Sequence, residues 1–139
     1  VDIEGLICNV AFVKTPLGLP VLNKIIDAYE KAYPNLIVHD KGYPSAASLR
    51  SVAVAGQAGV GMADVGEGHD TPGSELIIHA VDSKDPRSVW VNAWGGMNTV
   101  AQALWKVKHT RSAADVAKFV SKLRIYDVLG QCDAYKRQV

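Results

Sequence analysis

The stretch VWVNAWGGMNT, residues 89–99, decides the fold of this chain. Its first part, residues 89–94, is a strand-length segment rich in β-branched and aromatic residues. Gly95 and Gly96 then allow the backbone to turn sharply. From there to about residue 108, apolar side chains recur at helical spacing. A strand that passes through a glycine turn directly into a helix predicts one unit of a parallel sheet.

The rest of the chain alternates in the same way between strand-like and helix-like segments. Ser45 and Ser112 are in position to cap helices, and Pro20 and Pro34 are predicted to open and close one. Six glycines between residues 56 and 73 predict a long loop. The expected strands are residues 3–10, 36–39, 89–94 and 125–128, and the expected helices are 20–34, 45–54, 74–81, 98–108 and the segment after 112. This order predicts an α/β fold with a mostly parallel sheet and helices on both faces.

The composition fits one globular domain and excludes several classes of function. The 139 residues are 48% hydrophobic and 21% charged, with a net charge of +1. We therefore expect no nucleic-acid-binding surface, since such binding requires many basic residues. No apolar run is long enough for a membrane span. Cys8 and Cys132 lie far apart and form neither a metal motif nor a disulfide framework.

The topology predicts where a ligand would bind. In parallel sheets, ligands bind beyond the carboxyl ends of the strands. We therefore expect one rim to gather the residues that follow each strand, together with the acidic part of the glycine-rich loop. These are Asn9, His39, Asp40, residues 94–98, residues 127–133, Asp64, Glu67, His69 and Asp70.

Two motifs on this rim have a functional and a structural interpretation. The turn of residues 95–99 could present free amides to an anion or a sugar hydroxyl, or it could be only a tight turn with Asn98 as the helix N-cap. The acidic loop, with Glu75 after it, could bind a hard cation or divide acid and base roles between carboxylates. Equally, it could be a solvated loop in which Asp70 or Thr71 caps the next helix.

Aromatic residues suggest a third kind of site. Trp90, Trp94 and Trp105, together with Tyr43, could form a sugar-stacking surface, because aromatic faces bind the apolar faces of sugars. Trp90 and Trp94 are four residues apart in a strand and should point to the same face. We expect Trp90 and Trp105 to pack in the core.

Several segments, taken together, resemble the nucleoside-hydrolase-like domain of bacterial and fungal cellulose-binding proteins. The most specific is VNAWGGMNT followed by AQAL, residues 91–99 and 101–104. The others are residues 2–6, 26–31, 33–36, 42–45, 65–68, 73–78 and 85–87. The resemblance runs from residue 2 to about residue 133, so we assign residues 1–133 to this domain and residues 134–139 to a divergent C-terminal tail.

The resemblance implies a doubly wound α/β fold like that of nucleoside hydrolases, which cleave N-glycosidic bonds at a calcium site. It implies that Asn98 lies at the calcium site. It makes Glu67, Asp70, Trp94, Gly95, Gly96 and Asp133 candidate substrate-binding residues for a carbohydrate or nucleoside-like small molecule. It also favours a secreted or periplasmic protein. The family's aspartate-rich metal motif lies upstream of the segment matched by residues 2–5, so the fold is expected to be a truncated form.

Three functions follow from this sequence. The first is a hydrolase of glycosidic bonds, impaired because the aspartate-rich motif is missing. The second is a noncatalytic module that binds carbohydrate such as cellulose. The third is an inactive fragment that is stable as a homo-oligomer.

Overall fold

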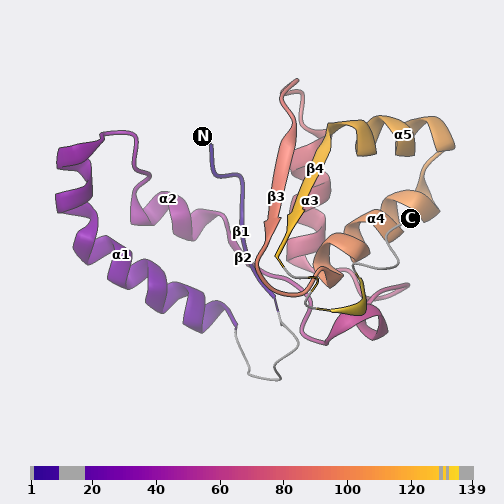
Figure 1. Cartoon of the computed structure of the whole chain (residues 1–139), viewed down its shortest axis with the longest axis horizontal. Helices are drawn as coiled ribbons and strands as arrows, with labels where there is room; N and C mark the ends of the chain where they lie inside the picture. Colours follow the sequence, from indigo (N-terminus) through magenta and orange to yellow (C-terminus); the bar gives the residue numbers. More distant parts are fainter. Residues whose placement is uncertain (1, 10–17, 129, 131, 135–139) are drawn as a thin grey trace.

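The structure, a computed structural model, describes residues 2–9, 18–128, 130 and 132–134. Helices and short strands alternate along the chain, as Figure 1 shows. Their order is β1 (Leu6–Cys8), α1 (Leu19–His39), α2 (Ala46–Ser51), β2 (Ala53–Ala55), the 3₁₀ helix η1 (Gly61–Asp64), α3 (Pro72–Asp82), β3 (Val89–Ala93), α4 (Asn98–Thr110), α5 (Ala113–Lys122) and β4 (Leu123–Asp127). The predicted α/β class is confirmed.

The strands form two parallel pairs. Strand β1 pairs with β2, Leu6 lying opposite Ala53, and β3 pairs with β4, Val89 lying opposite Leu123. Within the described residues these are two separate two-stranded sheets. The prediction of parallel strands is thus confirmed, but hydrogen bonding does not join all the strands into a single sheet.

Helices cover both faces of the first pair. Leu6 packs into a small core around Ile26 of α1 and Leu49 of α2. Its neighbour Ile7 points the other way and packs against a larger core that includes Ile77 of α3. Strand β2 accordingly contacts both α1 and α3.

The second pair is covered on one face. Val89, Val91 and Ala93 face the larger core with α3, α4 and α5, whereas Trp90 alternates to the opposite face and is 65% exposed. The expectation that Trp90 is a core residue is therefore wrong. Alternation in the sequence separates the two faces of a strand, but it does not tell which face another element covers.

Two predicted boundaries in the first half of the chain are wrong. Helix α1 does not end at Pro34 but continues to His39, so residues 36–39 are helical. A proline inside a helix removes one hydrogen bond. Pro34 lies on an exposed stretch of α1, where water can satisfy the freed carbonyl. Consequently His39 and Asp40 end and cap a helix and do not follow a strand.

Strand β2 lies where the sequence predicted the end of a helix. Helix α2 ends at Ser51, and the small residues of β2 then pass close to α3: a Cβ on Gly73 would lie 3.0 Å from the Ala55 carbonyl oxygen. A strand of only three residues is too short to show a two-residue hydrophobic period, which explains why the sequence pattern did not reveal it.

Helix ends follow the sequence more closely. Ser45 and Ser112 each accept a hydrogen bond from a backbone amide in the first turn of the helix that follows, and Pro20 occupies the first turn of α1. Among the described helices, none combines the length and apolarity needed to cross a membrane. Of the predicted tail, Ala134 is buried, and residues 135–139 lie outside the described residues.

Candidate functional site at the strand ends

Two asparagines join the carboxyl ends of β1 and β3. Asn9 follows β1 and Asn98 begins α4 after the glycine turn. The Nδ2 of Asn9 donates to the Gly96 carbonyl at 2.7 Å and to Oδ1 of Asn98 at 3.0 Å. The Nδ2 of Asn98 donates in turn to the Gly59 carbonyl in the glycine-rich loop at 2.7 Å. The predicted meeting of this turn and this loop at one rim is confirmed.

The asparagine bonds also show that the Asn98 side chain has a structural role. Asn98 is fully buried and both its amide nitrogen and its amide oxygen are engaged. The N-cap of α4 is Met97, not Asn98. The Met97 amide donates to the buried Cys132 thiol at 3.1 Å, which ties the glycine turn to the segment after β4.

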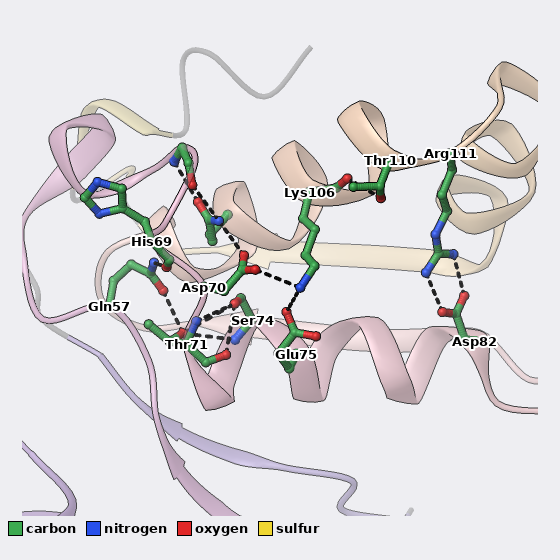
Figure 2. A network of polar contacts seen from close by, with 12 residues as sticks. Gln57, His69, Asp70, Thr71, Ser74, Glu75, Asp82, Lys106, Thr110 and Arg111 are labelled. Carbon is green, nitrogen blue, oxygen red and sulfur yellow. Dashed lines mark hydrogen bonds and ion pairs between the residues drawn. The ribbon is translucent and has the colours of Figure 1, made fainter.

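Gln57 holds the glycine-rich loop in place from inside. This side chain is buried, and its Nε2 donates to the carbonyls of Asp64, at 3.2 Å, and His69, at 2.6 Å. Its Oε1 accepts from the Thr71 hydroxyl at 2.9 Å, as Figure 2 shows. The predicted cap at Thr71 is confirmed, since its side chain accepts from the Ser74 amide. Sequence reasoning did not identify Gln57, because no motif spacing marks a lone glutamine.

Gln102 of α4 holds the same loop from the other side. Its Oε1 accepts from the Gly66 amide at 2.7 Å, and its Nε2 donates to the Gly66 carbonyl at 3.0 Å and to Oδ1 of Asp70 at 2.7 Å. Like Gln57 it is buried and was missed from the sequence. Its helical spacing from Asn98 places both amide side chains on one side of α4.

Asp70 is part of an ion-pair cluster between α3 and α4. Lys106 lies between Asp70, at 2.7 Å, and Glu75, at 2.6 Å (Figure 2). The hydrogen bonds from Lys106 and then Gln102 lower the pKa of Asp70 below its ordinary value. Asp70 therefore stays ionised and paired, which favours a structural role over that of a proton donor.

The other predicted acidic residues do not converge on one point. Glu67 is exposed. Asp133 accepts from the Met62 amide at 2.9 Å. Asp64 accepts from the Gly59 amide at 2.7 Å and lies 3.1 Å from Nδ1 of His69. Asp64 and Asp133 thus bind backbone amides of the glycine-rich loop and stabilise its conformation.

The described side chains do not fit a calcium site. No group of three or more His, Cys, Asp or Glu residues in the described part could hold a metal ion. Among the described residues, two buried side-chain oxygens lack a hydrogen-bond partner. They are Oδ1 of Asn9, the residue after β1, and Oδ1 of Asp127, the last residue of β4. Calcium takes roughly six to eight oxygen ligands, so two are too few.

Trp94 is a highly exposed candidate site residue. It follows β3 directly, beside the glycine turn, and is 74% exposed. Tyr43 lies in the segment between α1 and α2, at the end of the molecule away from β3 (Figure 1). The two residues therefore do not form one sugar-stacking surface.

Comparison with known proteins identifies the family. Residues 1–138 match the family described as cellulose-binding Sde182, nucleoside hydrolase-like domain. The chain belongs to this family. No curated protein matches it.

A solved structure supports the same assignment. It is described as a nucleoside hydrolase-related hypothetical protein from Saccharophagus degradans that is associated with carbohydrate metabolism. The two share 51% sequence identity and superpose with a TM-score of 0.90 over 96% of this nucleoside-hydrolase-like chain. The chain spans 33% of the length of that protein.

Proposed function

We propose that this nucleoside-hydrolase-like domain binds carbohydrate through Trp94 and does not hydrolyse it by itself. The observation that carries the proposal is the position of Trp94, highly exposed beside the glycine turn where strand ends meet. An indole face offers a large apolar surface to a sugar ring. The family's description as cellulose-binding and the relative's association with carbohydrate metabolism support this ligand class.

The state of the carboxylates argues for binding over catalysis. Glycosidases commonly use two carboxyl groups flanking the bond that breaks, one of them with a raised pKa. Asp70 has a lowered pKa instead and is paired with Lys106. Asp64 and Asp133 hold backbone amides. Asp70 is therefore not poised as a general acid, and the Asp64 and Asp133 carboxylates are engaged with backbone amides.

The test is retention on insoluble polysaccharides. We expect the protein to be retained on microcrystalline cellulose and Trp94→Ala to reduce the affinity by about tenfold, the loss of one stacking contact and its buried area. Tyr43→Ala is the matched control, since it removes an exposed aromatic residue far from β3. Circular dichroism confirms that both variants fold. Equal retention of Trp94→Ala and the parent protein would contradict the proposal.

Hydrolysis assisted by calcium is a second candidate: the two unpartnered oxygens of Asn9 and Asp127 are too few to form a site by themselves, but they could supply part of one. Further ligands would have to come from outside the described side chains. Calorimetric titration with calcium checks this candidate without any substrate. Absence of binding at millimolar metal would count against it.

A further inference from the structure

The exposed face of β3 and β4 carries aromatic residues in a regular pattern. Along β3, Val91 and Ala93 point into the core, while Trp90 and Asn92 are exposed on the opposite face. The alternation continues to the exposed Trp94. At a rise of about 3.3 Å per residue, the Trp90 and Trp94 positions are about 13 Å apart, more than a single sugar ring spans.

Tyr126 of β4 lies alongside the middle of this row. Asn92 and Tyr126 are register partners, so their side chains share a face, and Tyr126 is 55% exposed. Neighbouring strands are about 4.8 Å apart, which places Tyr126 beside the gap between the two tryptophans. We call Trp90, Tyr126 and Trp94 the aromatic strip.

The chemistry of the strip suits a neutral ligand with repeated rings. No carboxylate lies among the exposed-face residues of β3 and β4, which are Trp90, Asn92, Arg124 and Tyr126. Arg124 is turned toward the backbone, its guanidinium donating to the carbonyls of Ser121 and Leu123 at 2.8 Å each. The Asn92 amide and the Tyr126 hydroxyl remain beside the rings to hydrogen-bond to sugar hydroxyls.

We propose that the aromatic strip binds an extended β-linked glucan chain, with Trp90 and Tyr126 extending the contact that begins at Trp94. This inference rests on the proposed function at Trp94 and adds two binding residues and a preference for long chains. The three side chains of the strip are aromatic and uncharged, and the neighbouring Arg124 guanidinium is bonded to backbone carbonyls; this favours a polysaccharide over a charged ligand, and the strip is continuous with the Trp94 site. Successive rings stacked on successive side chains make the affinity increase with chain length.

The test compares cellobiose with cellohexaose by calorimetry. The parent protein is expected to bind cellohexaose at least about tenfold more tightly than cellobiose, one added stacking contact being worth that much. Trp90→Ala and Tyr126→Ala should lose most of this preference for cellohexaose, and Trp90→Tyr should restore part of the loss that Trp90→Ala causes. Tyr43→Ala should behave like the parent.

The outcomes separate the two proposals. If the parent protein binds neither oligosaccharide and is not retained on cellulose, the proposed function fails. If Trp94→Ala loses binding while Trp90→Ala and Tyr126→Ala retain the full preference for cellohexaose, only the strip is overturned. The strip is also overturned if the parent dimerises in light scattering and Trp90→Ala does not, because the face would then bind a second copy.

Discussion

At the scale of single residues, the Asn98 side chain links the end of β1 to the glycine-rich loop through two hydrogen bonds. Asn98→Ala would leave the Gly59 carbonyl without its donor and would remove one acceptor from Asn9. Leaving a buried polar group unpaired costs about 1–3 kcal/mol. Urea unfolding should therefore show that Asn98→Ala lowers the free energy of unfolding by this amount, both with and without calcium. Asn92→Ala, on the exposed face of β3, is the control and should change stability by less than about 0.5 kcal/mol.

Gly56 is a second residue that cannot change without cost. A Cβ there would lie 2.5 Å from Oγ1 of Thr99 and 2.9 Å from a methyl group of Ile7. Gly56→Ala should therefore destabilise the protein by about 1–3 kcal/mol, the usual range for overpacking a core. Thermal unfolding measures this, with Gly18→Ala as control, since a Cβ there would lie at an ordinary 3.4 Å from Cδ of Pro20. Equal stability of the two variants would show that the core around Gly56 yields easily.

Several residue-scale features could be predicted because local chemistry fixes them. The caps at Ser45, Thr71 and Ser112 depend on the residue type next to a helix start. Gln57 and Gln102 could not be predicted, since an amide side chain becomes important only when distant backbone groups surround it. The exposure of Trp90 depends likewise on what covers a face.

At the scale of elements, the ion pairs between α3 and α4 contribute a stability that depends on pH. The folded pKa of Asp70 lies below its unfolded value, so its contribution is present above the unfolded pKa and is lost as the pH falls through the folded pKa. Lys106→Met should lower the free energy of unfolding by at most about 1 kcal/mol at pH 7, because the pairs are partly exposed.

The difference between Lys106→Met and the parent should shrink once the pH falls below about 3.9, the ordinary value for an aspartate. Thermal unfolding over a pH series measures this difference. Lys108→Met, an exposed position on the same helix, serves as the control and should show little change at any pH. A difference for Lys106→Met that stays constant down to pH 2 would contradict the electrostatic origin.

Element types were easiest to predict where a segment is long or packs on one side. Helix α5 shows a clear apolar stripe, and β3 shows clear alternation. Strand β2 and the last turns of α1 were missed for opposite reasons. The first is too short to show a period, and the second has β-branched residues, Ile37 and Val38, that resemble a strand but lie exposed on a helix.

At the scale of the whole molecule, two cores of unequal size divide the chain. The small core joins α1 and α2 through Ile26, Ala46 and Leu49, while the large core joins α3, α4, α5 and the second strand pair. Regions with few buried apolar contacts open at lower free energy. Native-state hydrogen exchange should therefore show weaker protection for α1 than for α4.

The variant Ile26→Ala tests this division, since Ile26 is 2% exposed in the small core. This variant should lower the free energy of local unfolding around the small core by about 2–5 kcal/mol. It should abolish hydrogen-exchange protection in α1, while α4 keeps most of its protection. Val120→Ala, half exposed on α5, is the control and should leave α1 unchanged. Loss of protection spread evenly over both regions would show that the two cores unfold as one unit.

The bonds between Asn9, Gly96 and Asn98 also bear on how fast the chain folds. They join residues 87 and 89 positions apart in the sequence. Contacts of such long range require a large loop to close first, and proteins that depend on them fold slowly. If this junction forms after the rate-limiting barrier, removing the Asn98 side chain will leave the refolding rate almost unchanged and will speed up unfolding, as stopped-flow kinetics can measure.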